Sequence, residues 1–159
     1  IPKGKTSQAL TYLMDLNPTL CELAGAKVDP SVEGRDLMPI LDGKSAAVRD
    51  SLFLMYRGTQ RSVRDDRYKL IRFPEIDKTL LYDLQKDPSE MHDLSALPEQ
   101  KERIEHLGKL METWQHQVGD ASPLRIAEPR PPTRDLSGGK RKPDRWQPEW
   151  IQKKYCDTQ

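Results

Sequence analysis

Arg61–Leu94, RSVRDDRYKLIRFPEIDKTLLYDLQKDPSEMHDL, is the stretch of sequence that decides the fold. Short runs in which apolar and polar residues alternate are separated by Asp-Asp, by Pro-Glu-Ile-Asp and by Asp-Pro. Alternation of this kind is typical of strands, and the separating residues are typical of turns. Because proline cannot donate to a ladder, we expect the last strand to end before Pro88. The stretch therefore predicts an antiparallel meander.

Four strands and one long helix are expected in this part of the chain. The expected strands are Leu52–Arg57, Gln60–Arg64, Tyr68–Phe73 and Thr79–Leu84. Both faces of the first strand are largely apolar, which predicts a central place in the sheet. Apolar residues recur at three- and four-residue steps from Ile104 to Val118, between Pro98 and Gly119, and this predicts an amphipathic helix. The fold class is therefore α+β: a small antiparallel sheet of about four strands, packed by one long C-terminal helix.

A shorter helix is expected before the sheet, at Leu16–Ala24. Its expected boundary residues are Asp15 as N-cap, Pro18 in the first turn and Gly25 as C-cap. A helical turn is expected around Leu37–Leu41. Cys21 falls on the expected buried face of the helix, where a free Cys behaves as a small hydrophobe. A disulfide between Cys21 and Cys156 stays open, because the sequence does not fix the distance between their Cα atoms.

Charge and hydropathy point away from two classes of partner. The chain carries 26 Lys and Arg against 25 Asp and Glu, a net charge of +1. This balance gives no general reason to expect nucleic acid or an anionic membrane as partner. No apolar run approaches the ~20 residues that a membrane span needs. We expect no nucleic acid and no membrane as partner.

Residues 120–159 lack a hydrophobic period and hold six of the thirteen prolines. We expect a Pro- and basic-rich tail there. Gly138–Lys142 has neither the spacing nor the Ser/Thr of a phosphate loop, so a flexible basic linker is preferred to a nucleic-acid site. An aromatic anchor is expected at 146–155, with spacing that favours burial of its apolar side chains. Its apolar residues are Trp146, Trp150, Ile151 and Tyr155.

No catalytic or metal site is expected within this chain. His106 and His116 are ten residues apart on one helix and point to different sides, so they do not form a metal pair. The spacing of Asp87–Leu94 fits no EF-hand loop, and we prefer a role for Glu90 and Asp93 in capping free backbone donors. No Ser, Cys or Thr is accompanied by a base in a recognisable nucleophile context.

A cluster of arginines is the one functional candidate. Arg57, Arg61, Arg64, Arg67 and Arg72 fall within sixteen residues. A guanidinium offers two parallel donors to a sulfate or carboxylate, which suits an anionic sugar chain. The alternative is pairing with nearby acids, which we prefer for Arg64 and Arg72 and leave open for Arg57 and Arg61. The candidate substrate-binding residues are Arg57, Gln60 and Arg61.

The amino-acid sequence of the meander resembles the sequences of a known family. VRDDRYKLI (Val63–Ile71), LYDLQKDPSEMHDL (Leu81–Leu94) and a helix that ends in Trp114 resemble the C-terminal subdomain of the formylglycine-dependent sulfatases. DLNPTLCELAG (Asp15–Gly25) and EGRDLMPIL (Glu33–Leu41) resemble the stretch that precedes this subdomain. The resemblance covers about residues 5 to 120.

The resemblance implies a division of labour in a longer enzyme. Residues 1–50 are then the C-terminal end of the catalytic α/β domain, 51–119 are the C-terminal subdomain, and the missing N-terminal catalytic domain is the partner. The intact enzyme is expected to hydrolyse sulfate monoesters, with a sulfated polysaccharide as substrate, in the periplasm or after secretion. Its formylglycine arises from the Cys of a Cys-x-Pro/Ala-x-Arg motif, and one calcium ion is bound. Cys21 and Cys156 lack the Arg of that motif, so we expect the formylglycine and the calcium ion upstream of Ile1 and the isolated chain to be inactive.

Two other functions stay open at this point. One is a free-standing interaction or sugar-binding module with the same fold, and the other is part of a phosphodiesterase or phosphonate hydrolase of the same superfamily. If residues 1–50 belong to an absent domain, their helix is expected to leave an apolar patch exposed, with self-association as a result. The candidates for that patch are Leu13, Met14, Leu20 and Leu23.

Overall fold

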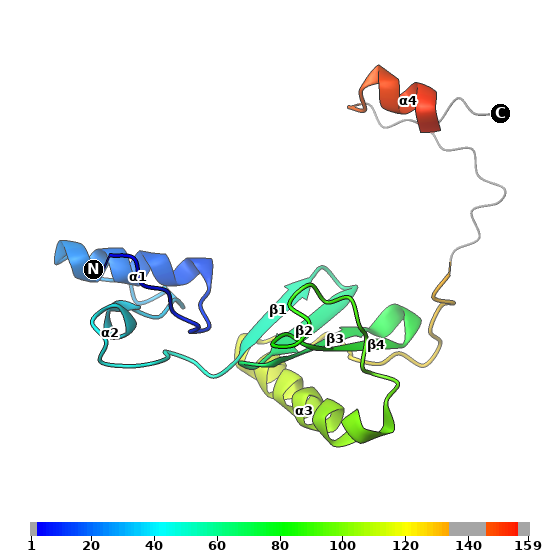
Figure 1. Ribbon diagram of the computed structural model, residues 1–159, viewed down its shortest axis with the longest axis horizontal. Coiled ribbons are helices and arrows are strands. Elements are labelled where there is room, and N and C mark those ends of the chain that lie inside the picture. Colours follow the sequence, from blue (N-terminus) through cyan, green and yellow to red (C-terminus); the bar gives the residue numbers. More distant parts are fainter. Residues whose placement is uncertain (1–2, 134–145, 156–159) are drawn as a thin grey trace.

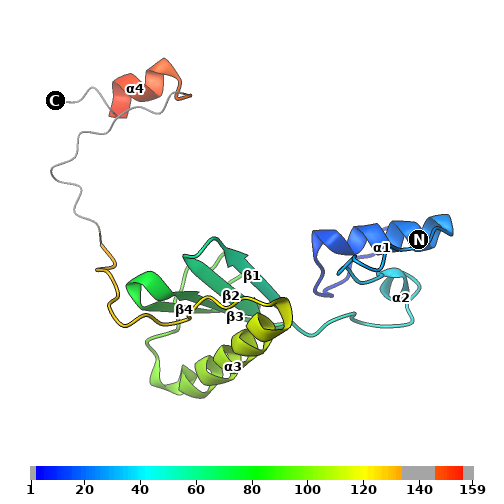
Figure 2. The ribbon, with the colours of Figure 1, turned by 180° about the vertical axis from the view of Figure 1, so that it is seen from behind.

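The computed structural model describes residues 3–133 and 146–155 (Figure 1). Its elements are η1 (Leu13–Asp15), α1 (Leu16–Ala24), α2 (Met38–Leu41), β1 (Leu52–Tyr56), β2 (Gln60–Arg64), β3 (Tyr68–Phe73), η2 (Pro74–Ile76), β4 (Lys78–Asp83), η3 (Pro98–Gln100), α3 (Lys101–Val118) and α4 (Glu149–Tyr155). The strands form one antiparallel sheet in the order β1-β2-β3-β4. α3 lies against one face of this sheet (Figures 1 and 2). The predicted α+β fold with four strands and one long helix is confirmed.

The hydrophobic core lies between α3 and the sheet. The pairing sets Val63 opposite Leu70 and Leu70 opposite Leu81, so these three side chains share one face. Leu107 and Met111, one helical turn apart on α3, complete the buried cluster. The full set of buried core residues is Phe53, Val63, Tyr68, Leu70, Leu81, Leu107 and Met111. Within the described part of the chain, no helix has both the length and the apolarity needed to cross a bilayer.

β1 lies at the edge of the sheet, so the predicted central place is wrong. It pairs with β2 alone among the described strands. Leu54, Met55 and Tyr56 at its end are 47%, 54% and 60% exposed. An apolar composition reports that both faces of a strand favour burial, and it carries no information on the order of strands in the sheet. The end of β1 therefore presents apolar side chains that this part of the chain does not cover.

Asp15 occupies the predicted N-cap position of α1, but its side chain makes no capping hydrogen bond to the helix and lies fully buried at 0% exposure. Its carboxylate accepts hydrogen bonds from the backbone N–H of Tyr12 at 2.6 Å and of Arg35 at 2.8 Å. Arg49 donates to both carboxylate oxygens, with Nη2 2.6 Å from Oδ1. The Tyr12 hydroxyl in turn accepts from the Phe53 N–H and donates to the Phe53 carbonyl. This network ties residues 10–49 to the first strand of the sheet.

The apolar face of α1 points outward. Pro18 and Thr19 are its buried residues, and the Thr19 hydroxyl accepts from the Leu37 N–H at 2.9 Å. The predicted patch residues Leu13, Met14, Leu20 and Leu23 are 84%, 43%, 61% and 48% exposed. Their predicted exposure is confirmed. Cys21, expected on a buried face, is half-buried, and Cys156, with which a disulfide was left open, lies outside the described residues.

Residues 120–133, here called the strap, differ from the free tail that the sequence predicts. Asp120 and Leu124 pack against the sheet module, and the Leu124 side chain extends the core. The Arg130 N–H donates to the Glu75 carbonyl at 2.6 Å. Figure 2 shows the strap, yellow to orange, running from the end of α3 toward η2. Its order comes from contacts with side chains of distant strands, which no local pattern reveals.

The expected aromatic anchor forms α4, which lies apart from the sheet in both views (Figures 1 and 2). Trp146 and Trp150 are 81% and 63% exposed, so their predicted burial is not seen within the described residues. Most of the expected basic linker, including Gly138–Lys142, lies outside them.

Candidate functional site

The turn between β1 and β2 brings the candidate substrate-binding residues together. Tyr56 pairs with Gln60 in the sheet, and residues 57–59 form the connection. Arg57 has φ of 49°, in the left-handed region that residues other than glycine rarely adopt. Its guanidinium carbon lies 5.5 Å from the centre of the Tyr56 ring, and both side chains are exposed. The tip of the hairpin therefore offers an aromatic ring and a cation side by side.

Arg61 points in the opposite direction, into the protein. It is 3% exposed, and its Nε and Nη2 donate to the two carboxylate oxygens of Asp120 at 2.6 Å and 3.0 Å. Nη1 donates to the carbonyls of Arg57 and Gln60 at 2.7 Å and 2.9 Å, and Nη2 also donates to Ser122 Oγ at 2.7 Å. All five N–H groups of the guanidinium thus have an acceptor in this chain. The geometry favours the structural alternative for Arg61, and direct contact of Arg57, Gln60 and Arg61 with a substrate stays a prediction.

Asp120 is held as a carboxylate. The hydrogen bonds from Arg61 lower its pKa, burial raises it, and further hydrogen bonds from Gln115 and Ser122 lower it again. The net pKa lies well below the usual range of an Asp side chain. The Gln115 amide donates to Asp120 Oδ2 at 2.9 Å, so the end of α3 also fixes this carboxylate. Asp120 is a site residue that the sequence analysis missed, because it lies past the periodic part of the helix.

The other arginines of the cluster have partners within the chain. Arg72, predicted to pair with an acid, forms an ion pair with Asp77 and donates to Thr79 Oγ1 at 2.7 Å and to the Leu124 carbonyl at 2.8 Å. Arg64 was also expected to pair with an acid, but its Nε donates to a backbone carbonyl, that of Asp65. The Asp65 side chain instead accepts hydrogen bonds from the N–H groups of Arg67 and Tyr68 in the turn that follows β2.

Arg67 binds Asp83, at the far end of the strands from the β1–β2 turn. Its Nε and Nη2 donate to this carboxylate at 3.1 Å and 2.7 Å. These hydrogen bonds lower the pKa of Asp83 to about 2, against a smaller opposing effect of burial. Asp83 is 5% exposed and Arg67 is partly exposed, so the pair joins a buried carboxylate to a guanidinium near the surface.

The acidic loop after β4 caps backbone groups in part as predicted. Asp93 Oδ1 accepts from the N–H groups of Leu81 and Ser95, at 3.1 Å and 2.9 Å, which confirms its capping role. Glu90 instead receives the Lys69 ammonium at 2.8 Å on each oxygen, because the residue turns its side chain toward β3 from a backbone φ of 55°. Within residues 3–133 and 146–155, no group of three or more His, Cys, Asp or Glu is placed to hold a metal ion.

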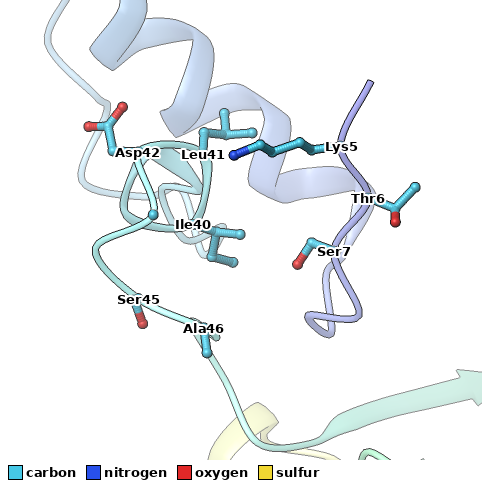
Figure 3. Close-up of a pocket in the computed structure, with 9 residues that line it drawn as sticks. Lys5, Thr6, Ser7, Ile40, Leu41, Asp42, Ser45 and Ala46 are labelled. Carbon is cyan, nitrogen blue, oxygen red and sulfur yellow. The ribbon is translucent and has the colours of Figure 1, made fainter. Parts of the chain in front are cut away.

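A surface pocket of about 420 Å³ lies between residues 5–7 and residues 40–46 (Figure 3). Lys5 extends into it toward Leu41, and Ser7 and Ser45 add hydroxyl groups. Its one acid, Asp42, is bound to the Lys44 ammonium at 3.2 Å. The residues that line the pocket include no His or Cys, so it holds neither an imidazole base nor a thiol nucleophile.

Comparison with known proteins assigns a family to this geometry. The family model described as N-sulphoglucosamine sulphohydrolase, C-terminal, matches residues 1–117. The chain belongs to this family. This sulfatase C-terminal segment therefore carries the β1–β2 hairpin, the core and α3 within the matched range, whereas Asp120 lies just beyond it.

Similar proteins include two curated sulfatases. One is the ulvan-active sulfatase of Formosa agariphila, 29% identical over 76% of this chain and 32% of its own length. The other is the N-acetylglucosamine-6-O-sulfatase of Bacteroides thetaiotaomicron, 31% identical over 77% of this chain and 24% of its own length. The sulfatase C-terminal segment thus spans about a quarter to a third of these relatives.

Solved structures share the fold. A proposed sulfatase of Bacteroides thetaiotaomicron superposes with a TM-score of 0.62 at 29% identity, covering 74% of this chain and 27% of that chain. A phosphonate monoester hydrolase of Agrobacterium radiobacter superposes with a TM-score of 0.50 at 25% identity, covering 65% and 24%. The sulfatase likeness is the closer of these two.

Proposed function

We propose that this chain is the C-terminal part of an enzyme that hydrolyses sulfate monoesters on a sulfated polysaccharide. The match of residues 1–117 to a sulfatase C-terminal family carries the proposal. The names of two relatives, one ulvan-active and one an N-acetylglucosamine-6-O-sulfatase, support a sugar substrate. The likeness to a phosphonate monoester hydrolase supports the rival, a related phosphonate hydrolase, at lower structural similarity.

The described residues do not fit the formylglycine or the calcium ion that the family resemblance implies. Cys21 is half-buried and is followed by Glu22 and Leu23, without the Arg of the motif. No described cluster of acids and imidazoles is placed to hold a cation. In our proposal both groups belong to the rest of the enzyme, and no chemical step is assigned to a residue of this segment.

The segment has a supporting role and a substrate-bordering role in this proposal. The outward apolar face of α1, with Leu20 61% and Leu23 48% exposed, supports contact with the catalytic domain. It also supports self-association when that domain is absent. The exposed Tyr56 and Arg57 support contact of the hairpin with an anionic glycan, because an aromatic ring packs on sugar carbons and a guanidinium binds sulfate.

The proposed location is the periplasm or the exterior of the cell. The support is physical: a polymeric anionic sugar does not cross a lipid bilayer unaided, so an enzyme that acts on it must meet it outside the cytoplasm. Fractionation of cells that produce the intact enzyme tests this. Activity confined to the cytoplasm contradicts it.

Substrate class is tested with the intact enzyme that contains this segment. Release of inorganic sulfate from a sulfated polysaccharide is compared with hydrolysis of a phosphonate monoester at equal enzyme concentration. The proposal expects kcat/KM to be higher for the sulfate ester. A preference for the phosphonate ester contradicts the proposal and supports the rival.

Contact by the hairpin is tested with Arg57→Gln in the same enzyme. Within residues 3–133 and 146–155 the exposed Arg57 guanidinium forms no ion pair with a carboxylate, so thermal stability is expected to stay unchanged. Loss of one charged hydrogen bond to substrate is expected to lower kcat/KM on a polymer, by the equivalent of about 1.5–3 kcal/mol of activation free energy. A small aryl sulfate that does not reach the hairpin serves as control substrate. Equal losses on both substrates contradict the contact.

A further inference from the structure

The β1–β2 turn has little support of its own. Besides the sheet pairing of Tyr56 with Gln60, the Thr59 N–H donates to the Tyr56 carbonyl at 3.3 Å, and the Thr59 hydroxyl donates to the same carbonyl at 3.1 Å. Arg57 adopts a positive φ without being glycine. Such a conformation persists where surrounding contacts determine it. The shape of this turn therefore depends on contacts from outside it.

Arg61 supplies those contacts. Its Nη1 donates to the carbonyls of Arg57, the first residue of the connection, and of Gln60, the first residue after it, so a single guanidinium nitrogen ties the two ends of the turn together. The pairing places Arg72 of β3 directly opposite Arg61, and two like charges at that spacing repel. A carboxylate on the other side of the Arg61 guanidinium offsets this repulsion.

Asp120 is that carboxylate, and it is itself fixed. Its side chain is 7% exposed and receives Arg61 through two parallel hydrogen bonds. The Asp120 N–H donates to the Gln115 carbonyl at 2.9 Å, and the Gln115 amide donates to the Asp120 side chain and to the Ser122 carbonyl. A continuous series of hydrogen bonds therefore leads from the end of α3 through Asp120 and Arg61 to the β1–β2 turn.

We infer that Asp120 is a positioning residue, which holds Arg61 and thereby fixes the turn that presents Tyr56 and Arg57 to a sulfated glycan. The inference rests on the proposed function. It assigns the strap, through Asp120 and Ser122, an indirect part in substrate recognition, by way of Arg61. It also explains why Arg61, which is buried and has an acceptor for each of its guanidinium N–H groups, lies next to the exposed pair of Tyr56 and Arg57.

The test uses Asp120→Asn in the intact enzyme, with Asp83→Asn as matched control. Asp83 is a second nearly buried carboxylate that binds one arginine, at the opposite end of the strands, so its loss destabilises the module without touching the turn. Asp120→Asn is expected to raise KM for a sulfated polysaccharide at least fivefold, with kcat within twofold. Both constants for a small aryl sulfate are expected within twofold, and Asp83→Asn is expected to lower the melting temperature without changing the ratio between substrates.

Hydrogen exchange gives a readout that does not depend on activity. Amides of residues 57–60 are expected to exchange faster in Asp120→Asn and at the wild-type rate in Asp83→Asn. Should Asp120→Asn not fold, Ser122→Ala replaces it, because this change removes one acceptor of Arg61 and leaves the ion pair. A shift in the same direction, of about twofold in KM and in exchange, is then expected.

Three results overturn the inference. The first is an equal loss on polymer and aryl sulfate, the second an unchanged KM for the polymer in a folded variant, and the third a polymer-specific effect of the Asp83→Asn control. An intact wild-type enzyme that releases no sulfate from any ester is a different result: it contradicts the proposed function, and this inference falls with it.

Discussion

Asp15 and Asp120 each bring an arginine from a distant part of the chain into the protein interior. Asp15 binds Arg49, 34 residues away, and Asp120 binds Arg61, 59 residues away. Both carboxylates accept further hydrogen bonds from neighbouring groups. At the scale of single residues, these two pairs decide which loops are fixed to which element.

Asp15→Asn is expected to destabilise the protein strongly. The change leaves the Arg49 guanidinium, 6% exposed, without its charged partner, and breaking a buried pair costs about 3–5 kcal/mol. Urea unfolding followed by tryptophan fluorescence measures this loss. Asp42→Asn is the control, because its pair with Lys44 is exposed and such pairs contribute about 0–1 kcal/mol. Similar losses of unfolding free energy in the two variants would show that the buried pair stabilises the protein no more than the exposed pair does.

Acid is expected to destabilise the protein below about pH 4. The pKa values of Asp15 and Asp120 are lowered in the folded state, and that of Asp83 is lowered to about 2, whereas an unfolded Asp titrates near 3.9. Below about pH 4 the unfolded chain therefore binds protons that the folded chain does not, and stability falls as pH decreases toward 2. Melting temperatures between pH 6 and pH 2 measure this dependence. A flat profile contradicts it, and Asp83→Asn should make the decline shallower.

Regular elements could be predicted closely from the sequence. Period-2 alternation and turn residues located β2 and β3 to the residue, and the three- and four-residue period located α3. These signals are local, since they depend on neighbours within one element. The edge place of β1 and the docking of the strap depend on pairing between distant residues, and the local pattern contains no trace of either.

Gly34 shows how a loop residue fixes the place of an element. A Cβ at this position would lie 2.2 Å from the Met14 carbonyl oxygen, so the loop passes η1 at a distance that only glycine permits. Gly34→Ala is expected to lower the free energy of unfolding by about 1–3 kcal/mol through this overlap. Gly108→Ala in α3 is the matched control, because nothing lies within 4 Å of its added Cβ, and it should stabilise the helix by about 0.5–1 kcal/mol. Thermal unfolding of both variants checks the prediction, which fails if Gly34→Ala is neutral.

The candidate site could be located from the sequence only in part. Arginine density drew attention to the hairpin, and Arg57 does lie exposed at its tip. The same density gave no means to separate Arg57 from Arg61, because the partner of Arg61 lies 59 residues later in a proline-rich stretch. Which arginine faces solvent is decided by the whole molecule, through the path of the strap.

Self-association of the isolated chain is expected through the outward face of α1. Leu20 is 61% exposed at the centre of a patch with Leu13 and Leu23, and burial between two copies removes this apolar surface from water. Leu20→Lys is expected to shift the chain toward monomer in sedimentation velocity at high concentration. Met91→Lys, at a position 74% exposed outside this patch, is the control and should leave association unchanged. A wild-type chain that stays monomeric at high concentration contradicts the expectation.

The proposed function places catalysis outside this segment. The direct measurement is release of inorganic sulfate from a sulfated polysaccharide and from an aryl sulfate, with calcium present, by the isolated chain and by the intact enzyme in parallel. We predict sulfate release by the intact enzyme and none above the buffer rate by the isolated chain, because the described residues offer neither a formylglycine motif nor a metal cluster. Turnover by the isolated chain that survives mutation of both Cys21 and Cys156 would contradict it.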